Sequence, residues 1–213
     1  MNLKCFVAVL GVVFALFSGA ALADSYDEML TAVKGGNVAA VQALLAKGID
    51  VDSTDRIGTT LLMAAATEGR LDTVKVLVAA KAKLNARNQY GESALMMASI
   101  QGHRSVVEHL LASGADVNPK GWTPLMFAAV KGHVEIARML LAKGAKVDAS
   151  SENGTTALML AAKEGNLDTV LALLEHGAAV NLRNLAGVTA LGLALEGQKR
   201  NVASALLRAG AEQ

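Results

Sequence analysis

The feature that most constrains this chain is a phrase of nine residues that recurs along it. The phrase at 121–129 reads GWTPLMFAA, and variants of it occupy 58–66, 91–99, 154–162 and 187–195. The glycines that open the phrases are separated by 33, 30, 33 and 33 residues. A period of this length predicts a solenoid of small units, each of which buries its apolar face against its neighbours.

Each phrase has the composition of a helix start. Its opening glycine suits a tight turn at positive φ. The hydroxyl two residues later can accept a hydrogen bond from an unpaired backbone N–H at the helix N-terminus. Pro124 follows one of these hydroxyls at the first helical position, where its missing N–H costs nothing. The predicted N-cap residues are Thr60, Ser93, Thr123, Thr156 and Thr189.

Two further glycines mark the ends of the two helices in most units. The first ends the opening helix and lets the chain reverse. A second helix follows, with an apolar stripe such as Val107, Leu110 and Leu111, and another glycine ends it. Lys81 stands where the second unit should have that glycine, and a side chain with a Cβ is disfavoured in the left-handed conformation expected there. The two sets are Gly36, Gly69, Gly102, Gly132 and Gly165, and then Gly48, Gly114, Gly144, Gly177 and Gly210.

The phrase and its period resemble the ankyrin repeat and its T-P-L-H-x-A signature. The resemblance covers 26–211 and implies an all-α fold, an ankyrin-repeat solenoid of stacked helix-turn-helix units with hairpin-like loops. We call these loops fingers. We expect one domain at 24–213, with polar caps as its first and last repeats. The six expected repeats are 26–54, 55–87, 88–118, 119–150, 151–183 and 184–213.

Two departures from the family pattern concern the core and one finger. Methionine fills the slot that the family usually gives to His. Because packed helices lie roughly 8–10 Å apart, successive sulfurs cannot share one metal ion. We therefore expect the thioethers to fill the core, and we expect no cofactor and no metal. Asn118 and Gly121 are three residues apart where equivalent pairs are six apart, so this finger is predicted to be short. The methionines are Met63, Met96, Met126 and Met159.

Residues 1–23 lie outside the repeat and have the pattern of a secretory signal peptide. Lys4 precedes an apolar run, and Ala21-Leu22-Ala23 resembles a cleavage site. We expect cleavage after Ala23, a polar and unstructured start at Asp24, and a mature protein in the bacterial periplasm. A retained N-terminal anchor is the alternative, because the run approaches the ~20 apolar residues that span a bilayer. The signal holds Cys5, the one cysteine of the chain, so the mature protein can form no internal disulfide.

The charge balance narrows the class of partner. The whole chain has 20 basic and 19 acidic residues, and removal of the signal takes away Lys4 alone. A chain without an excess of Lys and Arg is a poor match for nucleic acid or for an anionic membrane. We therefore expect a monomer that binds a protein partner, with no nucleic acid and no membrane association after signal cleavage.

Residues suited to catalysis are few. The chain has no H-E-x-x-H, Gly-rich phosphate loop or G-x-S-x-G pattern. His103 and His133 occupy the same slot of successive units, which the ankyrin family often fills with His for structural reasons. We therefore expect no enzyme activity. A periplasmic hydrolase is the alternative from another functional class.

The ankyrin family usually binds its partners with its concave face, formed by finger tips and exposed positions of the first helices. Tyr90 and Trp122 lie on adjacent fingers, where solubility alone would favour polar residues. Aromatic residues often dominate interface energetics, so we expect these two at the centre of the binding surface. In the alternative, Trp122 folds back over the short finger and covers its neighbours. The predicted partner-binding residues are Arg56, Ile57, Gln89, Tyr90, Ile100, Lys120, Trp122, Val130 and Lys131.

The functional prediction is a non-catalytic protein–protein interaction module or scaffold. An inhibitor or immunity protein that covers a toxin or an enzyme is the alternative. Phe127 is predicted to face the core between repeats, so its truncation should cost far more stability than the truncation of Trp122.

Overall fold

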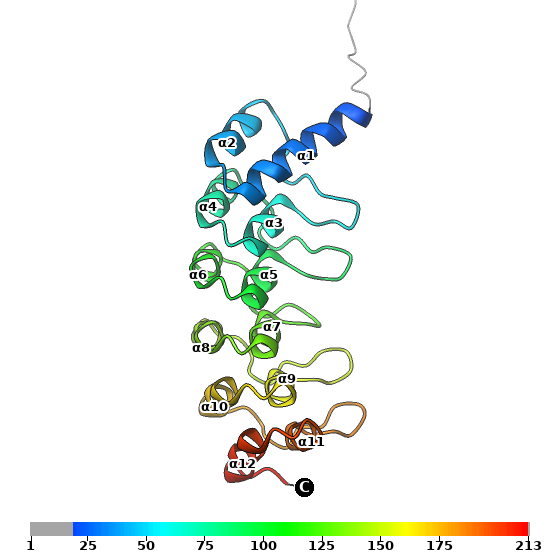
Figure 1. Cartoon of the computed structure of the whole chain (residues 1–213), viewed down its shortest axis with the longest axis vertical. Coiled ribbons are helices and arrows are strands. Elements are labelled where there is room, and N and C mark those ends of the chain that lie inside the picture. Colours follow the sequence, from blue (N-terminus) through cyan, green and yellow to red (C-terminus); the bar gives the residue numbers. More distant parts are fainter. Residues whose placement is uncertain (1–18, 213) are drawn as a thin grey trace, which may run out of the picture.

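The computed structural model describes residues 19–212, with side chains from Tyr26 onward. Figure 1 shows helix pairs stacked in one row, with the inner helices beside the fingers and the outer helices on the opposite side. Within residues 19–212 there is no strand beyond two isolated bridges, so the predicted all-α class is confirmed. The inner helices are α1 (Gly19–Gly35), α3 (Leu61–Thr67), α5 (Ala94–Gln101), α7 (Pro124–Lys131), α9 (Ala157–Glu164) and α11 (Ala190–Glu196). The outer helices are α2 (Val38–Ala46), α4 (Leu71–Ala79), α6 (Arg104–Ala112), α8 (Val134–Ala142), α10 (Leu167–Glu175) and α12 (Arg200–Arg208).

The inner helices from α3 onward begin as predicted. The hydroxyl oxygen of Thr60 accepts a hydrogen bond from the Met63 amide at 3.1 Å, and Pro124 opens α7 directly after its N-cap Thr123. The buried Met63 also turns its sulfur back to the Thr60 amide, at 3.5 Å. Its thioether therefore fills core space and completes a helix cap, which confirms the structural role predicted for the methionines.

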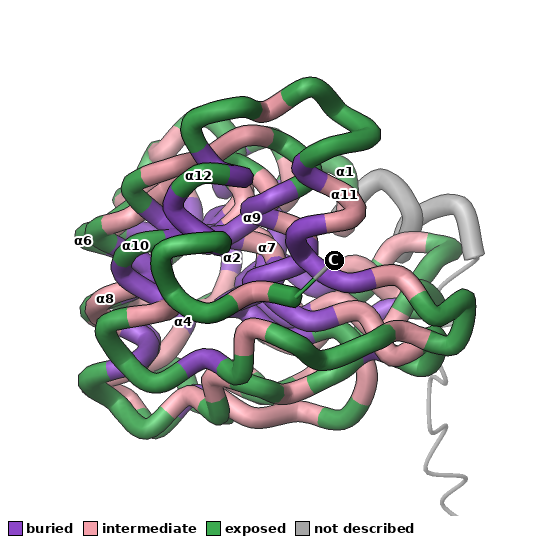
Figure 2. The backbone as a smooth tube through the Cα atoms, turned by 90° about the horizontal axis from the view of Figure 1, so that it is seen from below, coloured by how far each residue is buried: buried purple, intermediate pink, exposed green. Residues whose placement is uncertain are grey.

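The core is a continuous layer between the inner and outer helices. Figure 2 shows buried backbone along the helices and exposed backbone around the rim. At least one alanine of each inner helix from α3 onward is completely buried, and the one in the shared slot is small enough to let the next inner helix approach closely. The alanines in this slot are Ala65, Ala98, Ala128, Ala161 and Ala194.

Polar side chains at the start of the outer helices tie neighbouring units together. The imidazole of His103 lies 2.9 Å from the Thr67 carbonyl, and that of His133 lies 3.1 Å from the Ile100 carbonyl. Each ring reaches the end of the preceding inner helix, where carbonyls lack helical partners. The structural role predicted for these two histidines is confirmed.

The helix ends follow the predicted glycine pattern, with two substitutions. Lys81 adopts the left-handed conformation at φ 68, as its slot predicts. Gln198 does the same at φ 55, which the sequence analysis did not anticipate. Counted from the N-cap threonine, Gln198 occupies the slot that Gly165 fills in the preceding unit. Gly197 lies one residue before that slot, so the left-handed conformation falls on a residue with a Cβ.

The beginning of the described chain differs from the prediction. Helix α1 starts at Gly19 and continues through Asp24, so the expectation of an unstructured start at Asp24 is wrong. Alanine, leucine and aspartate at 21–24 extend the first helix of the cap unit without a Gly or Pro to interrupt it. The predicted signal lies mostly outside the described residues. No helix within 19–212 has the combined length and hydropathy that crossing a membrane requires.

Candidate functional site

The fingers are the loops from each outer helix to the next inner helix. Finger 1 is 52–60, finger 2 is 85–93, finger 3 is 118–123, finger 4 is 148–156 and finger 5 is 181–189. A polar side chain closes the tip of each long finger. In finger 2, the Asn88 side-chain oxygen accepts hydrogen bonds from the amides of Tyr90 at 3.0 Å and Glu92 at 2.9 Å. Asp55 and Asn184 close fingers 1 and 5 in the same way, and in finger 4 the Ser151 hydroxyl accepts a hydrogen bond from the Thr155 amide.

Finger 3 is visibly shorter than its neighbours, as predicted (Figure 1). The residues missing from it include the one that closes the other tips. The guanidinium of Arg87 instead donates a hydrogen bond to the Lys120 carbonyl at 3.1 Å. Finger 3 is therefore held from finger 2, and its tip stops short of the row formed by the others.

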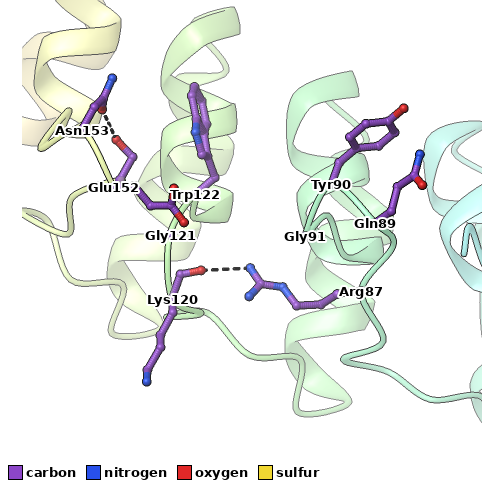
Figure 3. Close-up of a pocket in the computed structure, with 10 residues that line it drawn as sticks. Arg87, Gln89, Tyr90, Gly91, Lys120, Gly121, Trp122, Glu152 and Asn153 are labelled. Carbon is purple, nitrogen blue, oxygen red and sulfur yellow. Dashed lines mark hydrogen bonds between the residues drawn. The ribbon is translucent and has the colours of Figure 1, made fainter. Parts of the chain in front are cut away.

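A hollow of about 560 Å³ opens where finger 3 stops short. We call it the notch. Gln89 and Tyr90 of finger 2 form one wall, and Glu152 and Asn153 of finger 4 form the other, with Lys120 and Trp122 of finger 3 between them (Figure 3). The short finger that the sequence predicts thus creates a concave site at the centre of the finger row.

Two aromatic residues line this hollow, and in Figure 3 the Tyr90 ring points away from Trp122. Tyr90 is 69% exposed and Trp122 is 43% exposed. The Trp122 ring lies against Phe127, with 5.3 Å between ring centroids and 46° between ring planes. Trp122 therefore folds back onto its own inner helix while part of its surface remains available in the notch.

The predicted core position of Phe127 is wrong. Its side chain is half-buried and lies outside the buried core. On α7 the core-facing directions are taken by Leu125, Met126 and the alanines that follow, which leaves Phe127 and Val130, one turn apart, facing the fingers. Met97, Leu160 and Leu193 are half-buried in the same slot of α5, α9 and α11.

The predicted binding residues separate into two groups. Four of them, Gln89, Tyr90, Lys120 and Trp122, line the notch together. The other five lie beside it. Arg56 and Ile57 are exposed on finger 1, Ile100 on α5 and Val130 on α7 are half-buried, and Lys131 is exposed at the end of α7.

The binding prediction left out Arg87, Glu152 and Asn153, which also line the notch. The three-residue deficit of finger 3 could have indicated them, because it opens space toward both neighbouring fingers. It also left out Leu185, which is 82% exposed at the tip of finger 5.

The chemistry of the notch suits docking. It is lined by two basic residues, Arg87 and Lys120, by one acidic residue, Glu152, and by two aromatic residues, and Figure 3 shows the Lys120 ammonium pointing away from Trp122 and Tyr90. Across residues 19–212, no group of three or more His, Cys, Asp or Glu side chains is arranged to hold a metal ion. These groups can form hydrogen bonds, ion pairs and stacking contacts with a partner.

Comparisons with known proteins agree with the repeat architecture. A family model described as ankyrin repeats, in 3 copies, matches 11–88, 28–120, 82–151 and 146–213. A search of the curated proteins finds no match. Among solved structures, the predatory endopeptidase Bd0816 from Bdellovibrio bacteriovorus in complex with immunity protein Bd3460 contains a similar chain, the ankyrin-like immunity protein. The sequence identity is 34% and the TM-score is 0.76, over 85% of this chain and 97% of that chain.

Proposed function

This chain belongs to the ankyrin-repeat family, and on that premise we propose that it is an immunity-type protein that binds and inhibits an endopeptidase. Ankyrin repeats are protein-interaction modules. One observation carries the proposal. The chain is 34% identical to an immunity protein, the match covers 97% of that immunity protein, and the structure containing it is a complex with an endopeptidase. We therefore propose the inhibitor, which was the alternative in the sequence analysis, in place of the general interaction scaffold.

The proposed contact surface is the notch together with the adjoining inner helices. Tyr90 and Trp122 present aromatic surface to solvent beside charged groups. Interfaces concentrate their binding energy in a few such aromatic anchors surrounded by polar residues. The nine residues predicted from the sequence remain the proposed binding set, with Arg87, Glu152 and Asn153 added.

The proposed location is the bacterial periplasm. Two observations support it: the signal pattern at 1–23 and the similarity to a bacterial immunity protein. We further propose that the mature protein is a monomer without enzyme activity of its own.

The test uses the purified endopeptidase Bd0816 as the probe. Adding this chain should abolish its peptidase activity at a one-to-one ratio, and size-exclusion chromatography should show one complex. A complex with full peptidase activity would favour the scaffold alternative. If no complex forms at micromolar concentrations, the proposal is wrong. Peptidase activity of this chain alone would support the hydrolase alternative.

A further inference from the structure

The tips of the long fingers are joined in two pairs by backbone hydrogen bonds. The Gln89 amide of finger 2 donates to the Ile57 carbonyl of finger 1 at 2.9 Å. The Leu185 amide of finger 5 donates to the Asn153 carbonyl of finger 4, also at 2.9 Å. Gln89 and Leu185 occupy equivalent positions in their units, as do Ile57 and Asn153. The fingers thus form two pairs with the same register.

The register leaves one acceptor and one donor facing the notch. The Tyr90 carbonyl is equivalent to the carbonyls that accept in both pairs, and the Glu152 amide is equivalent to the amides that donate. Among the described residues, neither group has a hydrogen-bond partner. A full-length finger between them would have joined the two pairs into one continuous row.

Finger 3 cannot supply the missing bonds itself. Counted back from Gly121, the residue in the donating slot is Pro119, which has no amide hydrogen. The carbonyl in the accepting slot is that of Lys120, which already accepts from Arg87. The donating position therefore cannot join the row, and the carbonyl in the accepting position is engaged by Arg87 of finger 2 instead.

The space around the glycines agrees with this arrangement. A Cβ on Gly58 would lie 3.5 Å from the Asn88 Cα, and one on Gly154 would lie 3.1 Å from the Asn184 Cα. A Cβ on Gly91 or Gly121 would meet nothing within 4 Å. The row is closed at its two paired ends and open at the notch.

We propose that the notch receives one protruding turn of the partner protein, whose main chain takes the place of the missing finger tip. One residue of the turn donates its N–H to the Tyr90 carbonyl, and the next residue accepts from the Glu152 amide. Main-chain pairing of this kind supplies affinity and register, and the flanking side chains supply specificity. Tyr90 and Trp122 lie beside the turn and contact its side chains. This inference rests on the proposed function, because it requires the partner to be a protein.

The first experiment fills the notch from within. A finger-filled variant replaces Pro119 and Lys120 by the segment 149–153 of finger 4, which restores the full length of the finger. We expect it to inhibit Bd0816 at least 100-fold more weakly than the wild type, while its urea midpoint equals or exceeds that of the wild type. The matched control, Pro119→Ala, changes finger 3 without adding length and keeps Lys120 in place. It should inhibit within about threefold of the wild type.

The second experiment needs no endopeptidase. A cyclic peptide carrying residues 150–156 of finger 4 serves as a model turn. At millimolar concentrations it should shift the NMR signals of the Tyr90, Trp122 and Glu152 amides in the wild type. The same peptide should leave the finger-filled variant unchanged. Absence of shifts in the wild type, or shifts only on the outer helices, would overturn the inference.

The two experiments separate the inference from the proposed function. If the wild type and the finger-filled variant inhibit Bd0816 equally, the partner does not use the notch, although the immunity function stands. If the wild type fails to inhibit Bd0816 and the peptide still binds in the notch, the endopeptidase assignment is wrong and the turn-binding site stands.

Discussion

Lys81→Gly should stabilise the protein. Lys81 follows α4 at φ 68, in a slot where every other unit has glycine. The Lys81 side chain is exposed, and among residues 19–212 it forms no hydrogen bond or ion pair that the substitution would remove. The change therefore affects the backbone almost alone.

The magnitude follows from two opposing terms. A residue with a Cβ pays roughly 1–2 kcal/mol in the left-handed conformation. Glycine makes the unfolded chain more flexible, which offsets about 0.4–1 kcal/mol. The net expectation is a gain of roughly 0 to 1.6 kcal/mol in the free energy of unfolding, with its centre near 0.8 kcal/mol.

Urea unfolding followed by helical circular dichroism measures this gain. The midpoint of Lys81→Gly should rise while the slope stays constant. Gly144→Ala is the matched control, because Gly144 occupies the same slot at φ 86 and an added Cβ would meet no atom within 4 Å. Its midpoint should fall by a similar amount. A lower midpoint for Lys81→Gly would refute the reasoning, because the slot would then impose no left-handed strain.

Three other predictions concern the binding surface, the core and export. Trp122→Ala and Tyr90→Ala should each weaken binding to Bd0816 by about tenfold or more, as measured by calorimetry, and unchanged affinities would remove both from the interface. Phe127→Ala should destabilise less than Leu125→Ala in urea, because Leu125 is fully buried and its truncation should cost about 2–5 kcal/mol; the reverse order would restore Phe127 to the core. The intact mass of the exported protein should correspond to a start at Asp24, and a membrane-bound species that retains 1–23 would contradict export by cleavage.

The fold could be predicted almost entirely from the sequence because its signals are local and repeated. An N-cap hydroxyl such as Thr123, a glycine at a helix end and a completely buried alanine each act within one unit or between adjacent units. Lys81 was predicted to be left-handed because the five other units have glycine in its slot. Phe127 was placed wrongly because an apolar residue on an inner helix can face the core or the fingers.

The candidate site could be predicted only in part. The deficit of finger 3 is visible in the sequence, as are Tyr90 and Trp122. The notch itself depends on how finger 2 pairs with finger 1 and finger 4 with finger 5, through bonds such as Gln89 to Ile57. These bonds join backbone groups about one repeat apart, and no side-chain pattern marks them. The deficit of finger 3 indicates Glu152 as a neighbour of the gap, but its place in one wall of the site follows from these bonds.

Hydrogen–deuterium exchange of the chain, alone and bound to Bd0816, tests the central claim that the partner binds at the notch. The peptides covering 87–91, 119–122 and 151–153 should gain protection in the complex, because exposed finger amides exchange readily until a partner covers them. The outer helices α6, α8 and α10 should exchange as they do in the free protein. Protection confined to those outer helices, with the finger peptides unchanged, would contradict the account.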